Sequence, residues 1–352
     1  MSGSLVATLD QGVGPAPGQL RVVLSRALER RMPRRRIVGM ERAPCPYGSS
    51  WWLEEITIDL DDESRITLVF KNLVHEANGS AARQVKPAFV TDPAREPWVY
   101  QNLLMDAPPG PPRLWAAVTD FAAARHWLFI ERVNGAPLAH VGDRDAWCAA
   151  AEWLGRFHAT APVRRSAHGP LLRHDQDYHR RWLDRALCVS QEDARADAAT
   201  RDVAREKLAR LRALALVHER ATEEVLATEP SLIHGEFYAS NVLIERSDAA
   251  FAVHPVDWEM AALGPPLLDL AALMSGRWST NDRIAMARAY REGTRSVGVR
   301  SPVLGELLLE VTACRLLLAV QWLGWAAEWT APAEHQNDWL EEAERCAREL
   351  RG

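Results

Sequence analysis

The chain has 352 residues, a length that allows two domains or one large two-lobed domain. Hydrophobic residues make up 47% of it and charged residues 25%, which is ordinary globular usage and argues against a disordered, collagen-like or repeat-array chain. The net charge of −5 argues against nucleic acids and anionic membranes as partners.

Lysine is scarce in this sequence. Three of the 42 basic residues are lysines, at positions 71, 86 and 207, and all the others are arginines. A coding bias toward arginine explains the imbalance most simply. It also singles out each lysine for closer inspection.

The cysteines and the apolar segments predict a cytoplasmic protein. The five cysteines are odd in number and form no C-x-x-C pair, so we expect reduced thiols rather than disulfides or a zinc site. The N-terminal residues lack the pattern of a signal peptide. The most apolar stretch, residues 311–327, contains Arg315 and Gln321 and falls short of the ~20 apolar residues that a membrane-spanning helix needs.

The first third of the chain is predicted to be rich in β-strands. Apolar residues at helical spacing predict a short amphipathic helix over 20–28. Strands are expected over 51–60 and 66–73, and the polar residues between them predict a hairpin. Two further strands are expected over 114–119 and 127–133.

The sequence pattern becomes mostly helical after the last of these strands. Asp143 is expected to cap a helix, and residues 194–226 are expected to form a long, charged helical region with a break. Short apolar runs predict small strands over 232–233, 242–244 and 251–256. We therefore expect two lobes, a β-rich one over residues 1–133 and a helical one over 134–352.

The residues from 265 onward are helical in pattern. Gly293 and Gly298 are expected to interrupt the helices, and Ser301-Pro302 is expected to begin a new one. Three aromatic residues share one helical spacing: Trp322, Trp325 and Trp329. Core packing explains this spacing, and a wall of a substrate pocket is the alternative.

The sharpest feature of the sequence is a polar loop between two apolar runs. Residues 232–244 read Leu-Ile-His-Gly-Glu-Phe-Tyr-Ala-Ser-Asn-Val-Leu-Ile, which places the carboxylate of Glu236 five residues before the amide of Asn241. A second carboxylate, Asp257, follows the next predicted strand. Phosphoryl transfer needs a carboxylate that orients the attacking hydroxyl and hard oxygen ligands for a metal ion, so these residues indicate that chemistry.

This pattern resembles the H-G-D-x-x-x-x-N loop and the D-x-[DE] segment of the aminoglycoside phosphotransferase and choline kinase-like superfamily. The matching residues here are His234, Gly235, Glu236, Asn241, Asp257 and Glu259. Residues 264–272 resemble the G-x-x-x-x-D-L-A continuation of that family. An Asx-rich turn between two buried strands would explain one such loop, but three linked segments in the right order favour the family.

The resemblance implies an α+β, protein-kinase-like fold with a small β-rich N-terminal lobe and a larger, mostly helical C-terminal lobe. It implies that Asn241 and Asp257 bind Mg²⁺ and that His234 braces the loop. It also implies that Asp269 fixes the loop from the helix behind it, and that ATP or GTP is the phosphate donor.

Glu236 departs from the family pattern, in which the catalytic residue is an aspartate. A carboxylate is retained, but it is one methylene longer. Base chemistry is possible if the backbone or the substrate shifts by about the length of a C–C bond. Because this catalysis depends on positioning, the change also fits a slower or degenerate enzyme. We favour an active enzyme, since the metal ligands are intact.

Lys71 is the candidate that would hold the nucleotide phosphates. It lies in an apolar strand, where an unpaired ammonium would be costly, and the resemblance implies that it pairs with a helix glutamate. Glu96 is the expected partner, with Glu76 as the alternative. Pro97 directly follows Glu96, so it must lie in the first helical turn or break the helix. An edge-strand lysine pointing at water is the simpler explanation, which the scarcity of lysine disfavours.

Two further segments resemble nucleotide contacts of the kinase-like fold. The turn over 46–50 lies where that fold places its phosphate-covering loop, and Ser49 or Ser50 would contact phosphate oxygens there. The strand end from Glu131 to Val133 resembles the segment whose backbone binds the adenine edge. A plain β-turn and an ordinary strand end are the alternatives. No G-x-x-x-x-G-K-[ST] motif of a P-loop kinase is present.

Taken together, the sequence predicts an ATP- or GTP- and Mg²⁺-dependent O-phosphotransferase acting on a small hydroxylated molecule, with antibiotics and secondary metabolites as the favoured acceptors. Glu236 would position the acceptor hydroxyl. A kinase-like module that binds nucleotide without turnover is the alternative. His158 is interpreted as a packing histidine on the inward face of its helix rather than as a ligand.

Overall fold

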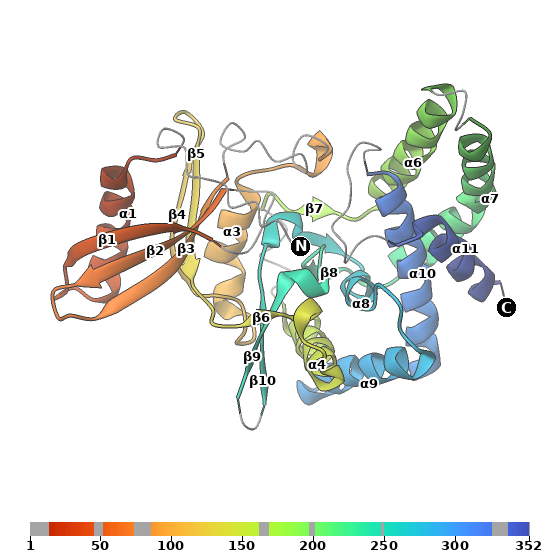
Figure 1. The fold of residues 1–352 in the computed structure, drawn as a ribbon. Helices are drawn as coiled ribbons and strands as arrows, with labels where there is room; N and C mark the ends of the chain where they lie inside the picture. The colour runs from red at the N-terminus through yellow and green to blue at the C-terminus, as the bar shows by residue number, and fades with distance from the viewer. Residues whose placement is uncertain are drawn as a thin grey trace, which may run out of the picture. The chain divides into compact units, whose positions relative to one another are not determined.

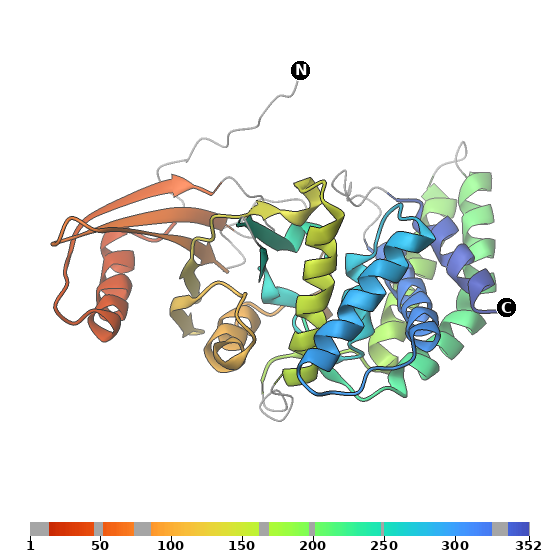
Figure 2. The ribbon, with the colours of Figure 1, turned by 90° about the horizontal axis from the view of Figure 1, so that it is seen from below.

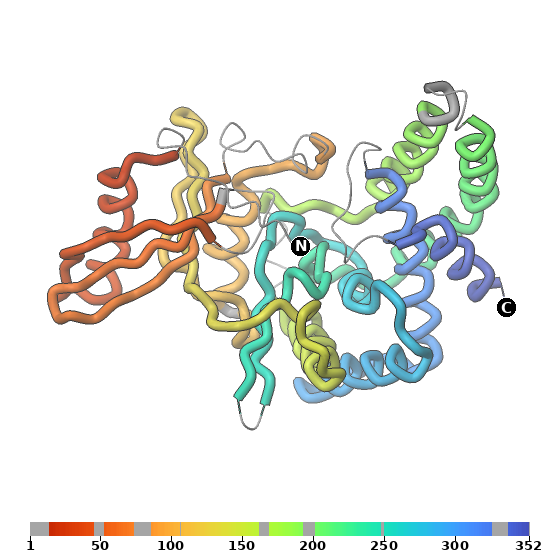
Figure 3. The backbone as a smooth tube through the Cα atoms, in the orientation of Figure 1, coloured from red at the N-terminus to blue at the C-terminus, as the bar shows by residue number. Residues whose placement is uncertain are grey.

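The computed structural model describes most of the chain, and Figure 3 draws the remaining residues in grey. The described ranges are 14–45, 52–73, 86–161, 169–196, 201–247, 250–325 and 337–351. Backbone contacts divide the chain into two compact units. One lies within Met1–Gln84 and Pro112–Arg132, and the other lies within Val85–Pro111 and Val133–Gly352. The segment 86–111 thus packs with the C-terminal unit.

The N-terminal unit is built on a five-stranded antiparallel sheet (Figure 1). Its strand order is β1-β2-β3-β5-β4. The bounds are β1 Ile37–Pro44, β2 Trp52–Leu60, β3 Arg65–Asn72, β4 Leu114–Asp120 and β5 Arg125–Glu131. The predicted hairpin of β2 and β3 and the predicted strands β4 and β5 are confirmed, whereas β1 was not predicted.

The helix α1, Pro17–Arg31, covers this sheet with one apolar face. Its buried residues, Leu20, Leu24 and Leu28, recur every fourth position and join the apolar side chains of β2 and β3 in one core. The predicted helix over 20–28 is therefore confirmed. Arg42 of β1 binds both carboxylate oxygens of the buried Glu54 of β2, at 2.7 and 2.8 Å, which fixes the register of these two strands.

The C-terminal unit is mostly helical. Its α-helices are α3 Arg95–Asn102, α4 Arg144–Thr160, α6 Gln176–Ala196, α7 Arg201–Leu226, α8 Leu267–Leu273, α9 Thr280–Ser296, α10 Leu304–Leu323 and α11 Trp339–Glu349. Asp143 caps α4 as predicted, accepting a hydrogen bond from the backbone of Asp145. In the part of the chain that the structure describes, no helix is both long and apolar enough to cross a bilayer.

Short strands form two small sheets within this unit. One has the order β10-β9-β6 and the other the order β7-β11-β8. The bounds are β6 Ala136–Pro137, β7 Leu172–Arg173, β8 Ser231–Ile233, β9 Val242–Arg246, β10 Phe251–Pro255 and β11 Ala262–Gly264. The small strands predicted over 232–233, 242–244 and 251–256 are thus confirmed as β8, β9 and β10.

The helices α4 and α9 lie side by side in both views (Figures 1 and 2). Gly155 of α4 and Gly293 of α9 lie at their closest approach. A Cβ on Gly293 would come within 2.0 Å of the Glu152 carbonyl oxygen, and one on Gly155 within 2.0 Å of that of Tyr290. The prediction that Gly293 interrupts a helix is wrong, because this glycine serves helix packing instead.

Two other predicted helix boundaries differ from the structure. The helical region expected over 194–226 begins earlier, at Gln176, and its break separates α6 from α7. The helix expected to begin at Ser301-Pro302 begins at Leu304, after an extended Val303. Gly298 lies just beyond α9 with a φ of +80°, so it does end a helix, as predicted.

Candidate active site

The polar loop of residues 234–241 connects β8 to β9, and β10 runs back beside β9 (Figure 1). Pro255 pairs with Val242, and the next backbone N–H, of Val256, donates to the Asn241 carbonyl at 2.9 Å. This register brings Asn241 and Asp257 to the same end of the β9–β10 hairpin. The structure therefore brings together the two residues that the sequence predicts as metal ligands.

Asp269 holds this loop from the first turn of α8. Its carboxylate accepts hydrogen bonds from the backbone N–H groups of His234, at 2.6 Å, and Gly235, at 2.9 Å. His158 of α4 donates from Nε2 to the same carboxylate at 3.2 Å, and its Nδ1 accepts from the Tyr290 hydroxyl at 3.0 Å. Asp269 is fully buried, and these bonds hold the start of the loop. His158 is satisfied inside the molecule, as predicted.

His234 joins the loop to the end of β10. Its Nε2 donates to the Val256 carbonyl at 2.9 Å, and its Nδ1 accepts from the backbone N–H of Glu236 at 3.3 Å. The ring is fully buried and packs against Trp258 with ring centroids 4.5 Å apart. These contacts give His234 the geometry of the bracing role that the family resemblance implies.

Two backbone conformations shape the loop. Gly235 has a φ of +83°, and a Cβ there would lie 2.2 Å from the Met260 carbonyl oxygen, so only glycine fits. Asp257 also adopts the left-handed region, with φ 65° and ψ 62°. Aspartate tolerates this region better than most residues. The turn after β10 is therefore built around this aspartate.

Asn241 is oriented by the loop that contains Glu236. Its Nδ2 donates to the Glu236 carbonyl at 3.0 Å, so its Oδ1 lies on the other side of the amide. Amide and carboxylate oxygens are the hard ligands that Mg²⁺ prefers, and Mg²⁺ commonly uses one or two protein ligands together with substrate phosphates. The donor chemistry and the shared hairpin end thus fit a magnesium ion bound by Asn241 and Asp257.

Glu96 contacts this region from α3. Pro97 lies in the first turn of the helix, where its missing N–H is tolerated, as the sequence requires. The buried Glu96 accepts a hydrogen bond through Oε1 from the backbone N–H of Trp258, at 3.1 Å. Burial, followed by the charges of Glu96 and Asp257, raises the pKa of Tyr100 well above its usual value, which places both carboxylates near the same hydroxyl.

Lys71 lies in β3 of the N-terminal unit and is buried. The alternative, an edge-strand lysine pointing at water, is therefore excluded. Glu96 belongs to the C-terminal unit, so the pairing of Lys71 with Glu96 stays a prediction. The alternative partner, Glu76, lies outside the described residues.

Lys86 is a candidate site residue that the sequence interpretation missed. It precedes α3 in the C-terminal unit, and its Nζ lies 2.7 Å from Oε1 of Glu259. Burial alone would lower the pKa of Lys86, but the charges of Glu259, Glu236 and Asp257 and the hydrogen bond with Glu259 outweigh it and raise the pKa. The scarcity of lysine was the signal available in the sequence, and it applied to this residue as well as to Lys71.

The charge of Glu236 acts on two buried tyrosines of the same unit, Tyr238 and Tyr178. Burial, followed by the charge of Glu236, raises the pKa of the Tyr238 hydroxyl, and that hydroxyl accepts a hydrogen bond from Trp322 at 2.8 Å. Burial raises the pKa of Tyr178 as well, with Glu236 contributing. Trp322 of α10 therefore packs against Tyr238 of the loop, while Trp329 lies outside the described residues.

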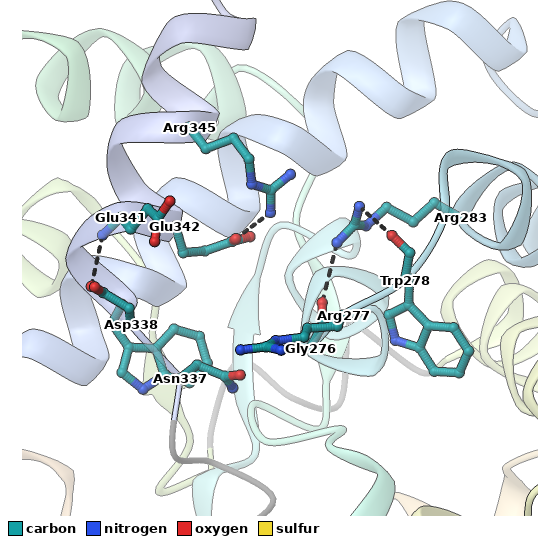
Figure 4. A pocket seen from close by; sticks show the side chains of 10 residues that line it. Gly276, Arg277, Trp278, Arg283, Asn337, Asp338, Glu341, Glu342 and Arg345 are labelled. Carbon is teal, nitrogen blue, oxygen red and sulfur yellow. Dashed lines mark hydrogen bonds and ion pairs between the residues drawn. The ribbon is translucent and has the colours of Figure 1, made fainter.

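A cavity of about 530 Å³ lies between the α8–α9 connection and the start of α11 (Figure 4). Its charged lining residues are Arg277, Arg283, Arg345, Asp338, Glu341 and Glu342. Trp339, which also lines it, stacks on Trp322 with ring centroids 5.3 Å apart and planes within 4°. One pair of stacked rings thus connects the cavity to Tyr238.

The remaining predicted nucleotide contacts are placed only in part. Ser49 and Ser50 lie outside the described residues. Glu131 ends β5 in the N-terminal unit, where it forms an ion pair with Arg113 at 3.0 Å, and Val133 is a buried residue of the C-terminal unit. Binding of the adenine edge by this segment stays a prediction.

Comparison with solved structures identifies the fold. The chain resembles a microcompartment-associated aminopropanol kinase with 14% identity over 89% of this chain and 92% of that one, at a TM-score of 0.56. It resembles a choline kinase from Cryptosporidium parvum Iowa II with 15% identity over 88% of each chain, at a TM-score of 0.53. It also resembles a spectinomycin phosphotransferase in complex with ADP and spectinomycin, with 11% identity over 93% of this chain and 92% of that one, at a TM-score of 0.51. The expected α+β, kinase-like fold is therefore confirmed.

A family assignment follows from the sequence itself. The model of the phosphotransferase enzyme family, APH, matches residues 96–303, which is more than half of the chain. The chain therefore belongs to this family, and the predicted family resemblance is confirmed. A comparison with curated proteins finds no match.

Proposed function

We propose that this chain is a Mg²⁺-dependent O-phosphotransferase that transfers the γ-phosphate of ATP or GTP to a hydroxyl group of a small molecule. The observation that carries the proposal is the loop geometry in a member of the phosphotransferase family. Asn241 and Asp257 share one end of the β9–β10 hairpin, and Asp269 holds the loop that carries Glu236.

Each residue of the candidate site would have its own role. Asn241 and Asp257 would hold the metal ion, which neutralises phosphate charge when it is bound. Glu236 would accept a hydrogen bond from the acceptor hydroxyl and orient it toward the γ-phosphate. Lys71 would hold the nucleotide phosphates from the N-terminal unit.

The aromatic side of Glu236 is our candidate for the acceptor position. Tyr178, Tyr238 and Trp322 supply large rings with polar edges near that carboxylate. Ligand pockets are commonly lined by such groups. The cavity beyond Trp339 offers further space for a larger acceptor. Antibiotics and other hydroxylated secondary metabolites belong in the acceptor panel, together with amino alcohols and sugars.

Single-turnover transfer of the γ-phosphate tests the proposal. The purified chain is mixed with Mg·ATP or Mg·GTP and with each acceptor in turn, and phosphorylated product is measured. We expect Glu236→Gln to lower the rate by ~10²-fold or more, because positioned base groups contribute that much. Asp177→Asn, which removes a carboxylate that is 71% exposed, is the matched control and is expected to leave the rate unchanged.

The second candidate function is a nucleotide-binding module without turnover. The longer side chain of Glu236 is the observation that favours it. This alternative predicts that Glu236→Ala and the wild type both bind Mg·ATP and are equally inert toward every acceptor. Transfer that depends on Glu236 would exclude it.

A further inference from the structure

Lys86 and Glu259 form a buried ion pair beside the candidate metal ligands. The ammonium and the carboxylate are 2.7 Å apart, and their side chains are only 5% and 6% exposed. Arg95 also contacts Glu259, but it donates to the backbone carbonyl, at 2.6 Å, rather than to the carboxylate. A buried charge is stable only when it is paired, so each member of this pair depends on the other.

The surroundings of this pair are strongly acidic. Glu236 and Asp257 add their negative charges to that of Glu259 at the Lys86 ammonium. Three carboxylates in one region repel one another, and the repulsion grows where the local dielectric constant falls, as it does around the buried Glu259. Lys86 contacts Glu259 and also experiences the charges of the other two.

Glu259 is also part of the turn that carries Asp257. The two residues flank Trp258, whose backbone N–H is held by Glu96, at 3.1 Å, and whose side chain is fully buried. A contact that holds the Glu259 carboxylate therefore also holds this short segment. The orientation of the segment decides where the Asp257 carboxylate lies.

We propose that Lys86 is a positioning residue of the phosphotransfer site. Its ammonium holds Glu259, fixes the Asp257–Glu259 turn, and offsets the repulsion that would otherwise move the Glu236 carboxylate away from the acceptor hydroxyl. This role rests on the proposed function. It assigns the second of the three lysines to the site, in addition to Lys71.

Steady-state kinetics provides the first test. Lys86→Met keeps the length of the side chain and removes its charge, and Lys207→Met removes an ammonium from α7 as the matched control. Loss of a residue that supports metal ligands costs ~10–100-fold in activity or metal affinity, so we expect kcat of Lys86→Met to fall by that factor. The KM for the acceptor is expected to change less than twofold. A kcat equal to that of Lys207→Met would overturn the proposal.

A double-mutant cycle distinguishes positioning from a general structural role. At saturating Mg·ATP, which offsets weaker metal binding, adding Lys86→Met to Glu236→Gln should lower the single-turnover rate by less than threefold if Lys86 acts through Glu236. A structural role would lower the rate by the same factor in both backgrounds, which would overturn the proposal. If Lys86→Met does not fold, Lys86→Arg replaces it in the cycle, and we expect an intermediate loss because the charge is kept.

Binding of Mn²⁺·ADP, measured by the electron paramagnetic resonance of Mn²⁺, gives a readout that is independent of turnover. We expect Lys86→Met to weaken this binding by a smaller factor than its ~10–100-fold loss in kcat, while Lys207→Met leaves it unchanged. Equal binding by both variants would refute only the role of Lys86. A wild type that neither binds Mn²⁺·ADP nor transfers phosphate would instead refute the proposed function, and with it this role.

Discussion

Replacement of Asp269 by asparagine tests whether this buried carboxylate holds the catalytic loop. The carboxylate accepts three hydrogen bonds: the N–H of His234 and Nε2 of His158 bind one oxygen, and the N–H of Gly235 binds the other. Asparagine offers one acceptor oxygen, and its NH₂ group must then face an N–H group. If the oxygen stays with His234 and His158, the Gly235 N–H loses its partner.

The loss of loop stability caused by Asp269→Asn follows from these contacts. A buried N–H without a partner costs about 1–3 kcal/mol, and each of the two remaining bonds loses about 1 kcal/mol when the acceptor loses its charge. The sum is at least about 3 kcal/mol, which corresponds to a change of roughly 100-fold in an equilibrium constant. Because the loop can open locally, we expect the effect to appear there first.

Hydrogen exchange measured by mass spectrometry provides the assay. The amide hydrogens of His234 and Gly235 are expected to exchange roughly 100-fold faster in Asp269→Asn, given the local opening free energy above. Peptides from β2 and β3 of the other unit should be unchanged. The control is Asp177→Asn, whose exposed ion pair with Arg180 contributes little to stability. Exchange of residues 234–235 within threefold of the wild type would refute the proposed anchoring by Asp269.

Two further predictions concern stability. Burial lowers the pKa of His174 and of His218 to about 4, so the unfolded chain takes up protons near pH 6.5 that the folded chain does not. The stability present above pH 6.5 is lost as the pH falls toward 4, by about 2 kcal/mol for each histidine at pH 5. Burial also lowers the pKa of His179, so His218→Gln should remove only its own share, about 2 kcal/mol, from the loss seen in thermal melts between pH 7 and 4.5. An unchanged loss would contradict this account. In the second case, Gly155→Ala places a Cβ 2.0 Å from the Tyr290 carbonyl oxygen and should cost about 1–3 kcal/mol. The control, Gly305→Ala in the first turn of α10, places a Cβ that meets no atom within 4 Å. Its free energy of unfolding, measured in urea, should be unchanged or higher by about 0.5–1 kcal/mol. Equal effects of the two variants would contradict the packing argument.

The elements that the sequence predicts are those whose burial follows a regular period. The strand β2 alternates apolar and polar residues from Ile56 to Leu60, β3 is a short apolar run bounded by polar residues, and α1 buries every fourth residue, so the pattern along the chain is enough. In β1, by contrast, Ile37 is the one fully buried residue, and no alternation is visible. That strand exists because it pairs with β2, and its Arg42 binds Glu54 across the sheet. Such pairing depends on tertiary structure rather than on a local pattern.

The candidate site likewise contains residues that the sequence predicts and residues that it does not. The loop with Glu236 and Asn241 is predictable because its chemistry lies in one short segment. The partners of His158 are not predictable, since Asp269 and Tyr290 are 111 and 132 residues away in the sequence. Lys86 was missed for the same reason: it lies in no predicted element, and its partner Glu259 belongs to a distant motif.

The two buried lysines have different surroundings, and this difference predicts different kinetic effects. Lys86 lies in the unit that contains Glu236, Asp257 and Glu259, so its charge acts on the groups that, under our proposal, orient the reacting atoms. Lys71 lies in the sheet of the other unit, and its expected role is to hold the nucleotide phosphates.

A charge that positions reacting groups affects kcat, whereas a charge that binds substrate and transition state equally affects KM. We therefore expect Lys71→Met to raise the KM for ATP more than it lowers kcat, and Lys86→Met to do the reverse. Steady-state kinetics at several ATP concentrations separates the two effects. If both variants changed KM and kcat in the same proportion, the assignment of separate roles to the two lysines would be wrong.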